Sequence, residues 1–424
     1  MVFRSPTSEP ENPHPFDIIQ HGHKDLVQAI AFNAYGDRCA TGGIDGRLRI
    51  FNRHQDGIWR LSDNWIAHSC EILELQWLPP TVYPNMVASL GIEGRFKLWA
   101  EDPGAPPGRR FSIRSGTGKP VSEIKSGMNP FRSFSVKHDD VTRRTWFALL
   151  ARNGHLSVFE GEEPETLVEY AKVDDFEAFP KPGRGELSCF KIQFDPNPEP
   201  CYAVLRAGVP RNTLSLLASG TLSVKIFRTR ETPGASFGSN SRAREFYLAV
   251  EIATHRRMVR DIAWAPANYR GYDIIATACQ DGYLRVFRID APYSEEDGRT
   301  WAEEDIMNNG KTAEEVAAAE LEAQARRPSL PLSGIRLELE KSNEPEPERI
   351  FTGQPGQIVH TAELLSQLDT ECPVWRVGFD DDGQILGCVG DEGRVMCYRQ
   401  KPNGEWAKSS ELGMMLSTIQ IPFE

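Results

Sequence analysis

The chain has 424 residues, with 48 basic and 60 acidic side chains and a formal net charge of −12. This negative charge repels nucleic-acid phosphates and anionic lipid, so direct nucleic-acid binding is not expected. No run approaches the roughly 18 apolar residues of a transmembrane segment, and the polar N-terminus lacks a signal-peptide pattern. Eight scattered cysteines without a C-x-x-C pair indicate free thiols, so no disulfide framework, metal or cofactor is expected.

The first repeat begins after an N-terminal segment. Residues 1 to 14 are polar and proline-containing, which predicts disorder, and Phe16 to Gln20 (FDIIQ) reads as a short strand. His23 to Phe51 predicts three strands joined by tight turns, including an Asp45-Gly46 hairpin. Ile58 to His68 predicts a fourth. Four short strands with an early histidine and a closing aromatic are typical of a WD-repeat propeller blade.

The same pattern returns along the rest of the chain. The second copy, His68 to Trp99, keeps the histidine and an acidic residue before glycine. The third, from about Val121 to Phe159, lacks the histidine, and the fourth, Leu187 to Phe227, lacks the Asp-Gly turn. The fifth, His255 to Phe287, returns to pattern, and the sixth ends at Tyr398. The sequence therefore predicts an all-β, six-bladed WD-repeat β-propeller.

A long insertion separates the last two blades. Between Ala291 and Ile350 there are 15 acidic and seven basic residues, and the alanine- and glutamate-rich run predicts partial helix. The segment reads either as a docking element for a basic partner or as a solvated loop. The predicted layout is blades one to five over residues 15 to 290, the insertion over 291 to 356, and the fifth blade's outer strand with blade six over 357 to 424.

Three repeats carry side chains that resemble a hydrolase triad. A catalytic set is needed once, whereas a hydrogen-bonded cluster that fixes a turn is needed in every blade. We therefore interpret them as structural turn clusters, and we expect no enzymatic activity. The residues are His23, Thr41 and Asp45; His68, Ser89 and Glu93, with the closing Trp99; and His255, Thr277 and Asp281.

Two groups of arginines lie in predicted loops. They read as solvated faces, or alternatively as contacts for an acidic partner. The groups are Arg109, Arg110 and Arg114, and Arg228, Arg230, Arg242 and Arg244.

The strand count predicts a ring that this chain does not close. The sixth blade has its own outer strand after Tyr398, so Phe16 to Gln20 is left over as the outer strand of a seventh, missing blade. A partner could then add strands beside it, packing between the first and sixth blades. The alternative is a closed ring of six, with Phe16 to Gln20 paired to blade six. The predicted contact residues are Phe16, Asp17, Ile18, Ile19, Gln20, Val27, Ile30, Phe32, Val374, Val377 and Phe379.

Several of these stretches resemble one family. HKDLVQAIAFNAYGDRCATGGIDGRLRIF and, above all, CPVWRVGFDDDGQILGCVGDEGRVMCYRQKPNGEWAKSSEL are similar to the Seh-type nucleoporins, the Sec-thirteen homologues of the nuclear pore scaffold. VRDIAWAPANYRGYDIIATACQDGYLRVF resembles their fifth blade. The resemblance is weaker over blades three and four and absent in the acidic insertion. The related COPII vesicle-coat propeller, usually more compact, and a generic propeller adaptor are the alternatives.

The resemblance implies a function. It implies an open propeller that an α-solenoid nucleoporin completes by donating a blade, within the Y-shaped coat complex and beside its other nucleoporins. The expected location is the nuclear pore complex at the nuclear envelope, with a role in protein and mRNA transport. The family also implies a second membership, in a nutrient-signalling coat complex at the vacuolar or lysosomal membrane.

Overall fold

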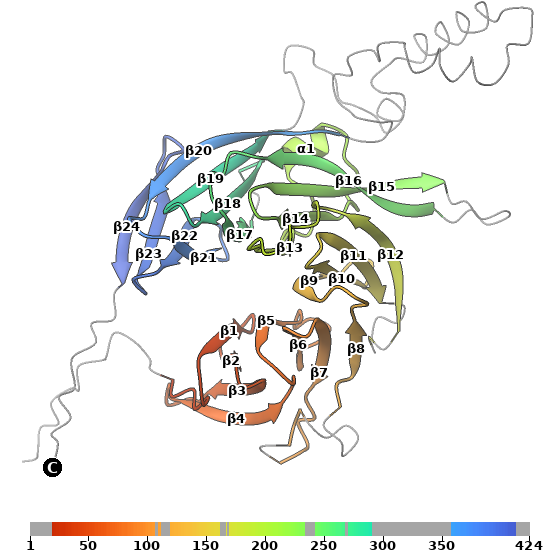
Figure 1. Ribbon diagram of the computed structural model, residues 1–424, viewed down its shortest axis with the longest axis vertical. Helices are drawn as coiled ribbons and strands as arrows, with labels where there is room; N and C mark the ends of the chain where they lie inside the picture. The colour runs from red at the N-terminus through yellow and green to blue at the C-terminus, as the bar shows by residue number, and fades with distance from the viewer. Residues whose placement is uncertain are drawn as a thin grey trace, which may run out of the picture. The chain divides into compact units, whose positions relative to one another are not determined.

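The computed structural model describes residues 19–106, 109–111, 119–161, 167, 169–233, 242–267, 270–290 and 358–412. These residues form six four-stranded sheets and one short helix, α1 (Tyr202–Arg206). They divide into two compact units, residues 1–125 and 126–424 (Figure 1). Each sheet is antiparallel, with its strands in chain order or the reverse, and is one blade of a six-bladed β-propeller, as the repeats predict.

The first unit contains two blades. Their strands are β1 (Val27–Phe32), β2 (Arg38–Gly43), β3 (Arg47–Arg53) and β4 (Trp59–Ile66), then β5 (Ile72–Trp77), β6 (Met86–Gly91), β7 (Arg95–Ala100) and β8 (Ser122–Lys125). The two sheets pack through a shared apolar core in which small residues of the first blade, such as Ala29 and Ala40, meet larger ones of the second, such as Ile72 and Trp77.

The second unit contains four blades. The third and fourth consist of β9 (Phe131–Asp139), β10 (Arg144–Ala151), β11 (His155–Gly161) and β12 (Tyr170–Glu177), then β13 (Lys191–Phe194), β14 (Ser215–Ser219), β15 (Val224–Pro233) and β16 (Arg242–Ile252). The fifth and sixth consist of β17 (Val259–Trp264), β18 (Asp273–Cys279), β19 (Tyr283–Asp290) and β20 (Thr361–Asp369), then β21 (Val374–Phe379), β22 (Ile385–Gly390), β23 (Val395–Gln400) and β24 (Trp406–Leu412).

Successive blades within a unit pack face to face. We call the side of a blade that faces the next blade in the chain its forward face, and the opposite side its rear face. A β-bulge near the start of the first strand recurs in four blades, for example between Val374 and Arg376. The bulge puts the first, fourth and sixth residues of the strand together on the rear face, as Val259, Ile262 and Trp264 do in the core between blades four and five.

The predicted turns and closing aromatics have a clear local basis. Gly46 has φ +70°, and a Cβ there would lie 2.4 Å from the carbonyl oxygen of His68, so glycine is required. Each closing aromatic lies on the third strand of its blade; these are Phe51, Trp99, Phe159, Phe227, Phe287 and Tyr398.

The structure corrects one boundary of the predicted repeats. The segment Ser122–Lys125, expected to open the third repeat, pairs with β7 and is the outer strand of the second blade. The third blade begins instead at Phe131. The acidic insertion over 291 to 356 and the N-terminal residues 1 to 14 lie outside the described residues.

Candidate functional site: the turn clusters and the rear face of the first blade

The side chains of two predicted turn clusters lie in hydrogen-bonding contact. In the first blade, His23 Nδ1 is 3.0 Å from Asp45 Oδ1 and Nε2 is 2.9 Å from Thr41 Oγ1. The second blade repeats this arrangement, as His68 Nδ1 lies 2.6 Å from Glu93 Oε1 and Nε2 lies 2.8 Å from Ser89 Oγ. The Trp99 indole also donates to Ser89 Oγ, at 2.9 Å.

The fifth-blade cluster differs in one contact. His255 Nε2 lies 2.9 Å from Thr277 Oγ1, but the carboxylate of Asp281 pairs with Arg285, at 2.7 Å, rather than with the histidine. Sequence reasoning missed Arg285, although it occupies the same third-strand position as Arg49 in the first blade. Burial, followed by the charge of Arg285, lowers the pKa of His255 to about 4.

These clusters are built for rigidity rather than for chemistry. The hydroxyl-bearing residues Thr41, Ser89 and Thr277 are all buried, so no substrate reaches them. The packing is also close, because a Cβ at Gly91 would lie 2.4 Å from His68 Nδ1. Burial lowers the pKa of the His68 imidazole, which therefore stays neutral near pH 7 and accepts or donates fixed hydrogen bonds.

The buried neutral histidine predicts a loss of stability in acid. Unfolding restores the ordinary His255 pKa of 6.5, so between about pH 6.5 and 4 the unfolded chain binds an extra proton. The free energy of unfolding therefore decreases as the pH is lowered through this range. His255→Gln, which keeps a hydrogen-bonding side chain but does not titrate, should remove about 2 kcal/mol of the loss between pH 7 and 5. Denaturant unfolding at the two pH values measures the difference between variant and wild type.

The comparison with wild type matters because other groups titrate in the same range. Burial and the charge of Asp273 raise the pKa of Asp195. The folded chain therefore takes up a proton at Asp195 more readily than the unfolded chain, so this group favours folding as the pH is lowered, opposite to His255. A His54→Gln variant, at an exposed histidine, provides the control. An unchanged pH dependence in the His255 variant would contradict the assignment.

Among the described residues of the first unit, no strand packs on the rear face of the first blade. The side chains of Ile30 and Phe32 are 60% and 55% exposed. Their counterparts in the fifth blade, Ile262 and Trp264, are 6% and 1% exposed because they pack on the fourth blade. In the first blade, two apolar side chains are exposed at positions that the preceding blade covers in the fifth blade.

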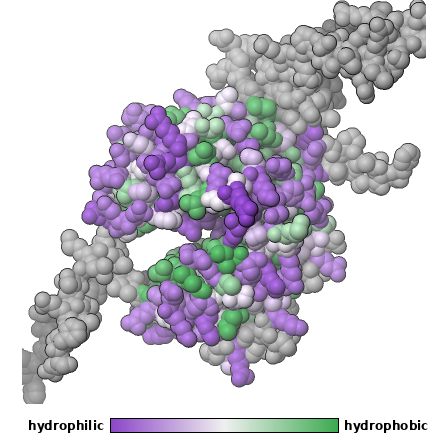
Figure 2. All heavy atoms as spheres, viewed as in Figure 1, coloured by the Kyte–Doolittle hydropathy of each residue, from purple (hydrophilic) through white to green (hydrophobic). Residues whose placement is uncertain are grey.

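The same side of the sheet carries a second exposed apolar residue on β4, with the buried Cys39 and Phe51 between it and β1. The strand register places Phe32, Cys39, Phe51 and Leu61 side by side on successive strands. Leu61 is exposed, and the Phe32 ring meets Trp59 edge to face at 5.8 Å. We call the exposed residues Ile30, Phe32 and Leu61 the first-blade apolar face. Figure 2 shows apolar residues, in green, on the first unit around β1 and β5.

The other predicted contact residues are distributed differently. Phe16, Asp17 and Ile18 lie outside the described residues, while Ile19 is half-buried and Gln20 exposed, both without strand structure. Val27 is half-buried at the start of β1.

The sixth-blade residues lie on the side away from the predicted gap. Val374, Val377 and Phe379 are on the rear face of that blade and pack on the fifth, and the Val377 amide donates to Asp261 Oδ2 at 3.0 Å. The surface that the sixth blade leaves for a contact is therefore its forward face, formed by Gly378, Gly387, Val389, Val395 and Cys397.

The predicted basic loops are largely structural. Arg228, expected in a loop, is on β15, fully buried, and pairs with Asp273 at 3.0 Å. Arg230 pairs with Glu245 and Arg110 with Glu101. Arg109 is exposed, and Arg244 lies over the Trp146 ring. Arg114 and the side chain of Arg242 lie outside the described residues.

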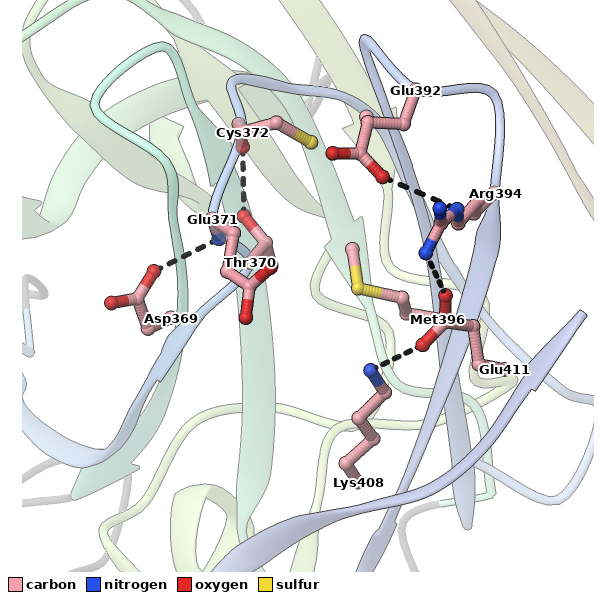
Figure 3. A pocket seen from close by; sticks show the side chains of 10 residues that line it. Asp369, Thr370, Glu371, Cys372, Glu392, Arg394, Met396, Lys408 and Glu411 are labelled. Carbon is pink, nitrogen blue, oxygen red and sulfur yellow. Dashed lines mark hydrogen bonds and ion pairs between the residues drawn. The ribbon is translucent and has the colours of Figure 1, made fainter. Parts of the chain in front are cut away.

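A small cavity of about 130 Å³ lies between the fifth and sixth blades (Figure 3). Four of the charged side chains that line it pair with one another: Glu411 accepts from Arg394 at 2.9 Å and from Lys408 at 2.6 Å. Glu392 also pairs with Arg394. Among the described residues, no group of three or more His, Cys, Asp or Glu side chains is placed to hold a metal ion. In the same residues no helix has the length and apolarity of a membrane span.

Comparison with known proteins gives related sequences over nearly the whole chain. A family model, "WD domain, G-beta repeat", matches residues 16–52. "Nucleoporin SEH1" of Chaetomium thermophilum is 43% identical, with 96% of each chain covered. "Nucleoporin SEH1" of Saccharomyces cerevisiae is 27% identical over 92% of this chain and 97% of the relative. The human protein of the same name is 20% identical over 92% of this chain and 85% of the relative.

Proposed function

Because this chain belongs to the SEH1 family of nucleoporins, we propose that it is a non-enzymatic scaffold subunit of the nuclear pore complex at the nuclear envelope. Its partners are then other nucleoporins. The finer parts of the proposal are membership of the Y-shaped coat complex, support of protein and mRNA transport, and a second membership in a nutrient-signalling coat at the vacuolar or lysosomal membrane.

We further propose that an α-solenoid nucleoporin donates strands that cover the first-blade apolar face. The support is the exposure of Ile30 and Phe32 at positions that are buried in the fifth blade. Burying a large apolar side chain contributes about 1.5 to 3 kcal/mol, so a partner gains substantially from covering both. Phe16 to Gln20 would add the outer strand of the completed blade by β-strand pairing.

The experiment is co-purification of the α-solenoid subunit with variants of this chain. Ile30→Asp combined with Phe32→Asp should weaken binding by about 100-fold or more, because two apolar anchors become charges that must be desolvated. Leu222→Asp, at a similarly exposed leucine in the fourth blade, is the matched control and should bind normally. Deletion of residues 1 to 20 tests the outer strand separately.

Two results would contradict this mechanism. Undiminished co-purification of the double variant would remove the apolar face from the interface. Alternatively, the double variant could unfold the isolated chain at a much lower temperature than Leu222→Asp does, which would indicate that the sixth blade covers this face in a closed ring.

A further inference from the structure

The bulge residues of the fifth and sixth blades contact each other. In each first strand the β-bulge leaves one residue out of the pairing register, Arg260 in β17 and Trp375 in β21. The guanidinium carbon of Arg260 lies 3.5 Å from the centroid of the Trp375 ring. A cation over the face of an indole is attracted by the ring's quadrupole, so this contact joins the two blades.

The Trp375 indole is exposed although it is held in place. Trp375 is 51% exposed, while the Arg260 side chain that covers one face of the ring is 11% exposed. At the ring edge, the indole N–H donates to Asp391 Oδ1. A large aromatic side chain that is fixed before binding loses little conformational entropy when a partner covers it. Trp375 is therefore suited to anchor a protein interface.

The bulge itself does not require an aromatic residue. In the first unit the bulge positions of β1 and β5 are occupied by Gln28, which is exposed, and by Leu73, which is half-buried. The fold of a blade therefore leaves the choice of residue at this position open, and the exposed tryptophan of the sixth blade calls for another explanation.

Two exposed arginines lie at the same end of these blades. Arg256 and Arg257 are on the loop that leads into β17, and the Arg257 carbonyl accepts from Cys279 Sγ, at 3.2 Å, where the β18–β19 turn begins. The loop that leads into β21 contacts the same turn, because the Thr370 amide donates to the Gly282 carbonyl at 3.0 Å. The two loops therefore flank one turn, which places both arginines at the end of the blades that carries the exposed indole.

The positive charge at this end is only partly balanced. Among the described residues, no carboxylate lies within 4 Å of the Arg256 or Arg257 guanidinium. Arg260 reaches the Asp391 carboxylate only at 3.8 Å, and that carboxylate also accepts the indole N–H of Trp375. An acidic ligand would therefore complement this surface, even though the whole chain carries a net charge of −12.

We propose that Trp375, Arg256, Arg257 and Arg260 form a docking site for an acidic segment of a partner protein. An apolar or aromatic side chain of that segment packs on the uncovered part of the indole, and its carboxylates pair with Arg256 and Arg257. Arg260 acts as a positioning residue, because it holds the ring from the other face. This site belongs to the second unit and the first-blade apolar face to the first, so the two proposals can fail separately.

A synthetic peptide tests the site directly. In fluorescence polarisation with the full chain, a fluorescein-labelled acidic peptide with a central phenylalanine, DEDFDED, should show saturable binding. The lysine peptide KKKFKKK should show none at the same concentrations. The peptide DEDADED should bind about tenfold more weakly than DEDFDED, because it lacks the side chain that packs on the indole.

Variants of the chain locate the binding. Trp375→Ala should weaken the binding of DEDFDED by about tenfold or more, because it removes the aromatic anchor. Arg256→Gln with Arg257→Gln should weaken it by about threefold at low salt, and high salt should abolish the difference. The matched controls are at exposed positions and should bind as the wild type does; they are Tyr35→Ala and the pair Arg152→Gln with Arg184→Gln.

A second variant separates a lost contact from a lost fold. Trp375→Phe keeps an aromatic ring and should retain most of the binding, and the thermal unfolding of Trp375→Ala should resemble that of Tyr35→Ala. Three results would overturn the proposal: equal binding of the acidic and lysine peptides, unchanged binding in Trp375→Ala, or no saturable binding of DEDFDED.

Discussion

Asp273→Ala should lower the free energy of unfolding of the second unit by about 3 to 5 kcal/mol. Arg228 and Asp273 pair at 3.0 Å with both side chains fully buried, and Arg228 also donates to Ser215 Oγ at 2.8 Å. Removing the carboxylate leaves the guanidinium buried without its counter-charge, which costs far more than the loss of an exposed ion pair. Denaturant unfolding followed by fluorescence measures the change.

Two further variants test whether the loss of stability in Asp273→Ala comes from the buried charge of Arg228 that is left without its partner. Glu245→Ala breaks the partly exposed Arg230–Glu245 pair on the same hairpin and should cost less than about 1 kcal/mol. Arg228→Met combined with Asp273→Leu should recover most of the stability lost in Asp273→Ala, because neither charge remains buried. Equal losses for Asp273→Ala and Glu245→Ala would contradict the interpretation.

Trp264→Ala should also cost about 3 to 5 kcal/mol, since it empties a large volume between the fourth and fifth blades. Trp264 is buried among Leu217, Ile226 and Phe287, and its amide donates to Gln193 Oε1 at 3.0 Å across the blade interface. The measurement is again the free energy of unfolding of the isolated chain.

Phe32→Ala provides a matched control. Phe32 occupies the same strand position as Trp264 but is largely exposed, so its removal should cost less than about 1 kcal/mol in the isolated chain. A loss for Phe32→Ala as large as that for Trp264→Ala would show that a preceding blade already covers Phe32 in solution.

The blades were predictable because their signals are local. Asp45-Gly46 and Asp281-Gly282 mark hairpins through glycine geometry, and each closing aromatic falls on a third strand. Ser122–Lys125 was assigned to the wrong blade because a long connection separates it from β7, whereas only five residues separate it from β9. Pairing between strands distant in the sequence leaves no local mark.

The candidate site was predictable only in part. Ile30 and Phe32 were among the expected contact residues, and they lie exposed on one face. The orientation of Val374 and Val377 depends on which blade covers which side of β21, and sequence periodicity alone does not settle this. The role of Arg228 was missed because its partner Asp273 belongs to another blade, 45 residues away.

The hairpin between β19 and β20 has a consequence for how this chain tolerates change in its length. Asp290 pairs with Thr361, so the two strands meet in register on either side of the acidic insertion. Doubling the length of a flexible connection between fixed ends costs only about 0.6 kcal/mol of closure entropy. The fifth blade is therefore a permissive place for evolution to lengthen, shorten or replace a segment, or for an experimenter to graft a reporter domain.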